Sequence, residues 1–290
     1  MGNGEGNLWL GRRVLAYAHQ GGAWEAPSST LFAVRRALEL GATGIELDVH
    51  ATADGHLVVS HDGTVDRTTD GVGAIHRMTL AQVRALDNAY WFAPGADVSP
   101  GLDPDAYPWR GRAPEDADFR VATLDEVLDI LDGHPDVALN LDIKATAPVV
   151  EPYEEALALV LAEHGHTERV IVASFLDTAT ERFRRYAPGV ATSAGTVAVA
   201  EFWRSLHQGG PPPTLACVAL QVPATQGDIV VVDPGFVRAA HDQGVAVHVW
   251  TVNDRADMAR LLDLGVDGII TDLPTMLVDL LDARGAGVGN

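Results

Sequence analysis

Several features are scarce in this chain of 290 residues, and each shortage excludes a class of protein. Its one cysteine, Cys217, has no second thiol with which to form an intrachain disulfide. The 20 Lys and Arg residues face 40 Asp and Glu residues, so the net charge of −20 lacks the positive footprint that nucleic acids require. No apolar run approaches the roughly 18 residues of a membrane span, and no signal-peptide core precedes Arg13. We expect a cytoplasmic protein without a nucleic-acid partner or a stable membrane insertion, and its oligomeric state stays open.

Lysine is the scarcest charged residue, because Lys144 is the only one in the chain. It ends an apolar run in which Asn140, Asp142 and Lys144 alternate with aliphatic residues, so all three share one face of an expected strand. A compact ammonium beside a carboxylate suits a phosphate pocket, where the planar fork of arginine is not equivalent. An acidic protein repels anions at long range, so a phosphate substrate needs such a local positive centre.

A second apolar run, Gly44–Val49, places two carboxylates on one face of another expected strand. Glu46 and Asp48 are two residues apart, and neighbouring carboxylates repel unless a cation or a shared proton holds them. His19 ends the preceding apolar run and His61 follows shortly after, so two candidates for proton transfer are close in sequence. A metal with an acid and a base is what phosphate-ester cleavage requires.

Apolar runs alternate with amphipathic stretches along the chain, and this alternation predicts the fold. Helical stretches follow the runs, with Ser29, Asp177 and Asp254 as expected N-caps and Pro234 in a first turn. Eight such repeats predict an α/β fold of the (β/α)8 TIM-barrel type, with a doubly wound sheet as the alternative. The expected strands are Val14–His19, Thr43–Val49, Val137–Lys144, Val170–Phe175, Val190–Ala194, Cys217–Gln221, Val245–Thr251 and Gly268–Thr271.

The polar residues noted above lie where a barrel enzyme places its active site, at the carboxyl ends of the strands. One long stretch interrupts the alternation after the second strand. We interpret residues 1–290 as a single domain, in which residues 50–122 form an insertion or lid over this end of the barrel. The insertion is rich in aromatic residues, which either anchor the lid or hold the leaving alcohol: Tyr90, Trp91, Phe92, Tyr107 and Trp109.

The order and spacing of these motifs resemble those of the glycerophosphodiester phosphodiesterase family, of a bacterial type. The resemblance runs from about Val14 to Leu281. The motifs that carry it are His19-Gln20-Gly21, Pro27-Ser28-Ser29-Thr30, Glu46-Leu47-Asp48, His61-Asp62, Asp66-Arg67-Thr68-Thr69, Asp142-Ile143-Lys144 and Trp250-Thr251-Val252-Asn253.

The resemblance implies metal-dependent hydrolysis of glycerophosphodiesters, a small-molecule substrate class, to an alcohol and glycerol 3-phosphate. Glu46, Asp48 and Asp142 are the expected ligands of a divalent cation, Mg²⁺ or Ca²⁺, because hard cations prefer oxygen ligands. The family pattern implies that His19 is the base and His61 the acid, although the sequence alone fixes neither role. The nucleophile is either water or the glycerol hydroxyl of the substrate, which would form a cyclic phosphate first.

Four further residues are expected to bind substrate: Gln20, Lys144, Phe175 and Trp250. Gln20 stands where the family has an arginine, and Asp142 stands where it has a glutamate. Ser28 and Ser29 replace the family's Glu-Asn. Two alternatives stay open. A lysophospholipase D or phospholipase that uses the same site on lipids would be favoured by an apolar lid rim, and a binding barrel that has lost catalysis would be favoured by Gln20 and Ser28.

Overall fold

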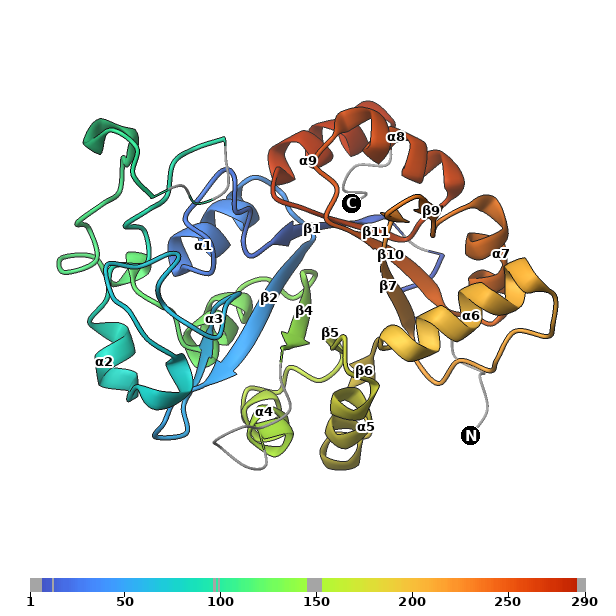
Figure 1. The fold of residues 1–290 in the computed structure, drawn as a ribbon, viewed down its shortest axis with the longest axis horizontal. Coiled ribbons are helices and arrows are strands. Elements are labelled where there is room, and N and C mark those ends of the chain that lie inside the picture. Colours follow the sequence, from blue (N-terminus) through green and yellow to red (C-terminus); the bar gives the residue numbers. More distant parts are fainter. Residues whose placement is uncertain (1–6, 12, 96–97, 99, 145–152, 286–290) are drawn as a thin grey trace.

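The computed structural model describes residues 7–11, 13–95, 98, 100–144 and 153–285. Eight parallel strands run side by side in the order β6-β5-β4-β2-β1-β11-β10-β7 and curve into a barrel, with helices around the outside (Figure 1). A bridge between Ser193 and Ala219 joins the two ends of this order, where Ala194 N–H donates to the Ala219 carbonyl. The prediction of a (β/α)8 barrel is therefore confirmed.

The strands of the barrel are short, as expected for a closed parallel sheet. They are β1 (Leu15–His19), β2 (Gly44–Ala51), β4 (Ala138–Ile143), β5 (Val170–Ala173), β6 (Ala191–Thr192), β7 (Ala219–Pro223), β10 (Ala246–Trp250) and β11 (Gly268–Thr271). Outside this path, β3 (Leu57–Val59) pairs antiparallel with β2, and β8 (Thr225–Gln226) and β9 (Ile229–Val230) form a hairpin.

The helices follow the strands. The α-helices are α1 (Leu31–Glu39), α2 (Leu80–Arg84), α3 (Leu124–Leu131), α4 (Tyr153–Glu163), α5 (Asp177–Tyr186), α6 (Thr196–Gln208), α7 (Pro234–Asp242), α8 (Arg255–Leu264) and α9 (Pro274–Ala283). Three short 3₁₀ helices lie in the insertion: Ile75–Arg77, Pro104–Ala106 and Ala117–Phe119. Within the described residues, no helix is both long and apolar enough to cross a bilayer.

Parallel strands bury both faces, which is why their sequences read as nearly continuous apolar runs. On β2, Ile45, Leu47 and Val49 pack outward against helices in one apolar cluster. Inside the barrel, Tyr17 and His248 are fully buried beneath the site. Burial lowers the pKa of His248 to about 3, because the charged imidazolium would lose its hydration. His248 is therefore a neutral packing residue.

Two expected helix caps are wrong, and one is confirmed. Thr30 rather than Ser29 caps α1, because Ser29 has a left-handed φ of 57° and Thr30 is extended and accepts from Ala33 N–H. Asp177 is the first residue of α5, and its carboxylate instead accepts from the backbone N–H groups of Val197 and Ala198 at the start of α6. Asp254 caps α8 as predicted.

The insertion lies to one side of the barrel, next to α1 and opposite α6 (Figure 1). Much of it is held by aromatic packing, since Trp109 contacts the rings of Phe32 and Phe92 at centroid distances of 4.9 and 5.0 Å. Phe119 stacks on Phe32 at 4.8 Å. The Arg110 guanidinium lies against a second set of rings: Tyr90, Trp91 and Tyr107.

Candidate active site

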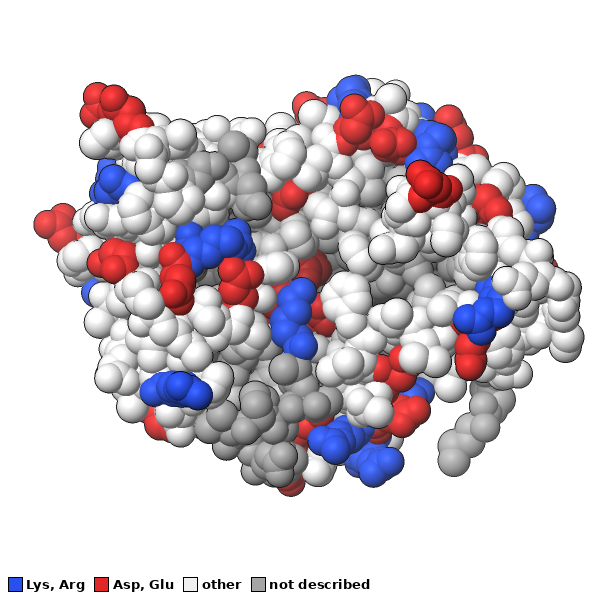
Figure 2. Space-filling model, viewed as in Figure 1, with Lys and Arg blue, Asp and Glu red and all other residues white. Residues whose placement is uncertain are grey.

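A cavity of 710 Å³ opens at the carboxyl ends of the barrel strands. Figure 2 shows the hollow in this face of the molecule, with acidic atoms in its depth. Its lining includes seven of the residues predicted from sequence: His19, Glu46, His61, Asp142, Lys144, Phe175 and Trp250. The other two, Asp48 and Gln20, are buried and contact this lining from behind. Residues far apart in the chain are thus gathered at one site.

His19, at the end of β1, is oriented by a carboxylate. Its Nδ1 lies 2.6 Å from Asp272 Oδ1, and Asn253 Nδ2 donates to the other oxygen of Asp272 at 2.7 Å. Because a carboxylate accepts hydrogen bonds, Nδ1 carries the proton and Nε2 is left to exchange protons with a substrate. Burial lowers the pKa of His19, but the charges of Glu46 and Asp272 outweigh burial and raise it to about 9.

His61, which follows β3, is oriented in the same way. Its Nδ1 lies 2.7 Å from Asp62 Oδ1, and Arg67 Nε donates to Asp62 Oδ2 at 2.6 Å. The hydrogen bond from His61, together with Arg67, holds the pKa of Asp62 well below its usual range despite partial burial. The rings of His19 and His61 are 6.2 Å apart between centroids and nearly perpendicular. The two candidate proton carriers therefore face one cavity from adjacent segments.

Three carboxylates and one ammonium form the charged floor of the cavity. The β2–β4 register places Asp48 beside Asp142, and Lys144 Nζ lies 2.8 Å from Asp48 Oδ1 and 3.1 Å from Asp142 Oδ2. Burial, reinforced by the charge of Glu46, raises the pKa of Asp48 to about 7. Burial also raises the pKa of Glu46, against the opposing charges of His19 and Lys144.

The floor has unused acceptor capacity. Among the described residues, Asp48 Oδ2 and Asp142 Oδ1 are buried oxygens to which no hydrogen bond is donated. An unpaired buried carboxylate oxygen is costly, and a divalent cation relieves that cost while preferring oxygen donors. The donor set of Glu46, Asp48 and Asp142 therefore fits a hard divalent cation.

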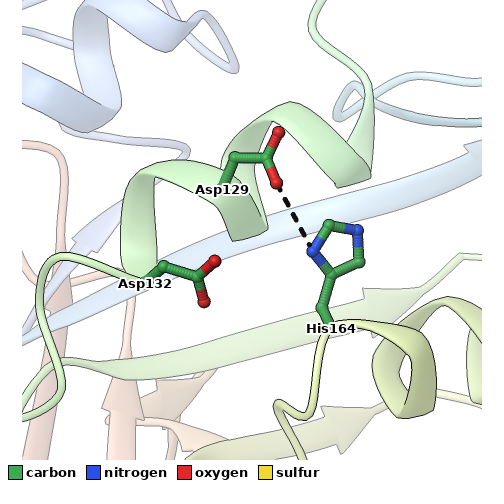
Figure 3. Close-up of side chains that lie close together, drawn as sticks. All are labelled: Asp129, Asp132 and His164. Carbon is green, nitrogen blue, oxygen red and sulfur yellow. Dashed lines mark ion pairs between the residues drawn. The ribbon is translucent and has the colours of Figure 1, made fainter.

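A more compact set of metal-type donors lies elsewhere, on the outer helices. Asp129 and Asp132 of the α3 segment and His164 at the end of α4 bring one donor atom each within 4.8 Å of one another (Figure 3). His164 Nδ1 is 3.5 Å from Asp129, and both aspartates are exposed. Exposed acidic groups gather in this way without an ion, and no second observation connects this set with the cavity.

The predicted substrate-binding residues differ in what they contact. Gln20 has a left-handed φ of 52°, its N–H donates to Glu46 Oε2 at 3.1 Å, and its side-chain Nε2 is 3.3 Å from His19 Nε2. Phe175 and Trp250 meet edge to face at 5.4 Å. Lys144 Nζ lies 5.6 Å from the Phe175 ring. Gln20 thus orders the charged floor, whereas the two aromatic rings wall it.

Sequence reasoning missed one whole wall of the cavity. Val199 and Trp203 of α6 and Ile229 of β9 line it together with the aromatic rings after β5 and β10. The sequence does indicate the hairpin, because the turn dipeptide Gly227-Asp228 stands between Thr225-Gln226 and Ile229-Val230. The spacing of the apolar residues of α6 is equally consistent with positions in the core. The sequence therefore did not indicate that some of them face the cavity.

Residues 19–276 match the family described as "Glycerophosphoryl diester phosphodiesterase family". The chain belongs to this family. It is 34% identical to the glycerophosphodiester phosphodiesterase of Caldanaerobacter subterraneus over 94% of this chain and all of that protein. It is 32% identical to the probable glycerophosphodiester phosphodiesterase 2 of Mycobacterium tuberculosis, over 93% of this chain and 92% of the relative. The family places the chain among the phosphoric diester hydrolases.

Solved structures of the family share the fold. A glycerophosphoryl diester phosphodiesterase domain from Mycobacterium tuberculosis superposes with a TM-score of 0.77 at 21% identity, covering 94% of this chain and all of that domain. A phosphodiesterase of Oleispira antarctica, solved with the product sn-glycerol-3-phosphate, superposes with a TM-score of 0.70 at 24% identity and covers 93% of this chain and 97% of its own. These similarities support the barrel.

Proposed function

We propose that this member of the glycerophosphoryl diester phosphodiesterase family hydrolyses glycerophosphodiesters to an alcohol and glycerol 3-phosphate. The observation that carries the proposal is the pairing of His19 and His61 across one cavity, each with its Nδ1 held by a carboxylate. Two histidines oriented alike present two Nε2 atoms to one substrate, which is what general acid and general base catalysis requires.

In this proposal, His19 in its neutral form, which becomes populated as the pH approaches 9, removes the proton from the nucleophile, which is water or the glycerol hydroxyl. The oxygen of the nucleophile bonds to phosphorus as the P–O bond to the alcohol breaks, and His61 gives its proton to the departing oxygen. If the glycerol hydroxyl is the nucleophile, water then opens the cyclic phosphate to glycerol 3-phosphate. Asp272 and Asp62 stabilise the positive charge on the two imidazoles as protons move, because each already accepts from Nδ1. The phosphate oxygens face Lys144, whose ammonium neutralises part of their charge.

Glu46, Asp48 and Asp142 would hold a divalent cation, Mg²⁺ or Ca²⁺. Such a cation supplies positive charge that stabilises the phosphate oxygens. Lys144 forms ion pairs with Asp48 and Asp142, so these ion pairs would adjust if a cation were held there. Gln20 contributes an amide where an arginine would add charge, and phosphate binding therefore depends more heavily on Lys144.

The test is hydrolysis of glycerophosphocholine followed by the release of choline and glycerol 3-phosphate. Chelation should abolish turnover, and added Mg²⁺ or Ca²⁺ should restore it. Asp48→Asn should weaken cation binding measured by calorimetry, and cation affinity should rise with pH up to about 7, because deprotonated Asp48 and Glu46 bind the cation better. Full activity in excess chelator would refute the metal scheme, and an inactive protein with bound cation would favour a binding barrel.

A further inference from the structure

Two amide side chains line the cavity inside the barrel, and the proposed reaction uses neither of them. Asn140 of β4 precedes Asp142 by two residues on the same face, so it lies one layer deeper, and its register partner on β2 is Glu46. Gln221 lies on β7, and its Nε2 donates to Asn140 Oδ1 at 3.2 Å. Because β5 and β6 separate β4 from β7 in the strand order, this hydrogen bond crosses the barrel interior. The bonded pair therefore forms an uncharged floor next to the charged one.

The buried ring of His248 determines which atoms of this pair stay free. Its Nδ1 lies 3.4 Å from Gln221 Nε2, and the neutral imidazole can accept a hydrogen bond there. The two N–H groups of Gln221 are then both engaged, one with Asn140 and one with His248. Among the described residues, Gln221 Oε1 and Asn140 Nδ2 have no hydrogen-bond partner, and neither atom is sealed from solvent. The pair thus offers the cavity one free acceptor and one free donor.

A hydroxyl group extends this uncharged floor. Ser193 follows β6, is 3% exposed and lines the same cavity. It forms a parallel bridge with Ala219 of β7, and its N–H donates to the Val172 carbonyl of β5, so the strands on both sides hold it in place. Side chains two apart on a strand share a face, so Ser193 lies on the side of the sheet that carries Gln221. No described residue bonds to Ser193 Oγ, and we name Asn140, Ser193 and Gln221 the polar patch.

A hydroxyl group is the ligand chemistry that matches the polar patch. A hydroxyl both donates and accepts, so one such group can bond to Asn140 Nδ2 and Gln221 Oε1 together. We propose that the polar patch binds a hydroxyl group of the diester and selects substrates that carry it over analogues that lack it. The inference rests on the proposed function and specifies its substrate class. The physical basis is that polar groups in a closed barrel are costly to leave unpaired when the bound substrate displaces water.

The hydroxyl can belong to the leaving alcohol or to the glycerol moiety, and three diesters of equal charge separate these sources. The propyl ester of glycerol 3-phosphate is the reference. Glycerophosphoglycerol adds hydroxyls on the alcohol, whereas the propyl ester of propane-1,2-diol 1-phosphate loses the terminal hydroxyl of the glycerol. All three keep the hydroxyl next to the ester carbon, so either nucleophile stays available. In one of the two pairs, kcat/KM should be at least about tenfold higher for the member with more hydroxyls.

Variants test whether the polar patch is responsible, and they cancel differences in intrinsic reactivity between the diesters. Ser193→Ala should lower the ratio of kcat/KM within the responding pair by about three- to tenfold, and Gln221→Met by at least about tenfold, because each removes a hydrogen-bonding group. Ser174→Ala is the matched control. Ser174 is also buried at 5% exposure and lines the cavity, but its Oγ already donates to the Ile143 carbonyl and accepts from Leu176 N–H. Its ratio should stay at the wild-type value, and thermal melting would verify that all three variants fold.

The outcomes separate this inference from the function on which it rests. If wild-type protein with Mg²⁺ or Ca²⁺ cleaves none of the diesters, the proposed function fails and the inference fails with it. If the diesters are cleaved but neither pair shows a preference for hydroxyls, only this inference is overturned. A preference that Ser193→Ala and Gln221→Met leave unchanged, or that Ser174→Ala weakens as much, would also overturn it, because the selection would then arise elsewhere in the cavity.

Discussion

The insertion of residues 50–122 and the rim formed by α6 and the β8–β9 hairpin are both rich in apolar side chains, yet they place them differently. In the insertion, Phe92 and Phe119 are 2% and 3% exposed and stack with Trp109 and Phe32. On the rim, Val197, Ile229 and Val230 are about half exposed or more, and Val199, Trp203 and Ile229 line the cavity. The two regions stand on opposite sides of the barrel (Figure 1).

The burial of apolar side chains in the insertion and their exposure on the rim determine what each region can contribute to the cavity. A segment without regular sheet or long helices must bury its own aromatic residues to stay folded, so few remain for a ligand. Of the described residues of the insertion, His61 is the one that lines the cavity. The regular helix α6 and its packing on the barrel stabilise the rim. The rim can therefore leave apolar side chains exposed at the cavity. The insertion therefore contributes His61 to the cavity, and the rim contributes apolar lining.

The largest expected effect concerns His61, the described residue of the insertion that lines the cavity. His61→Ala should lower kcat by roughly 10²- to 10⁴-fold for every diester, because it removes the proposed proton donor. Steady-state kinetics on glycerophosphocholine and on glycerophosphoglycerol would measure this, with thermal melting as the control for folding. Near wild-type turnover would show that His61 is not a catalytic residue. A loss confined to one substrate would show that the insertion also affects the choice of substrate.

The next effect concerns the aromatic packing of the insertion. Phe119→Ala should lower the free energy of unfolding by about 3–5 kcal/mol, the usual cost of removing a buried aromatic side chain. Urea denaturation would measure it, with Val72→Ala as a control, because Val72 is 82% exposed in the same insertion and should change stability little. Below the denaturation range, the ranking among substrates should be that of the wild type. An altered ranking would mean that the insertion also selects substrates.

A smaller effect concerns His19, which ends β1 beside the charged floor. In metal-free protein the pKa of His19 is raised to about 9 from about 6.5 in the unfolded chain. The imidazolium therefore stabilises the fold fully below about pH 6.5, and this contribution of at most about 3 kcal/mol is lost as the pH rises through 9. Melting in chelator from pH 6 to 10 should show the loss in wild type, and His19→Gln should lack it. If wild type and His19→Gln lose stability identically as the pH rises, the ion pairs of His19 do not stabilise the fold.

The smallest effect concerns the residue that positions His61 through Asp62. Arg67→Gln should lower kcat/KM by about fivefold for all substrates, corresponding to about 1 kcal/mol for a partly exposed ion pair. It should also raise the pKa of Asp62, since Arg67 helps to hold that pKa down, and titration of the Asp62 carboxyl by NMR would measure the change. Arg67→Lys should restore part of the activity. A change in the ranking of substrates would contradict a role limited to positioning.

The sequence alone determined the barrel and much of its charged floor. Strand alternation fixes which side chains share a face, so Glu46 and Asp48 were paired from their spacing, and the pairing of β2 with β4 adds Asp142. The ends of parallel strands meet at one end of a barrel, which explains why His19, Lys144 and Trp250 could be predicted to converge. These conclusions need only local geometry and one rule of topology.

The tertiary structure decided the rest, because it depends on contacts between segments far apart in the chain. Nothing in the spacing of Asp272 and Asn253 predicts that they orient His19 in series. The sequence predicted Asp177 as the N-cap of α5, but the turn before α6 brings the N–H of Val197 within hydrogen-bond distance of its carboxylate. Whether an apolar side chain faces the core or a cavity depends on which elements cover it. Phe92 and Phe119 of the insertion are buried for that reason, whereas Val197 and Ile229 of the rim stay exposed.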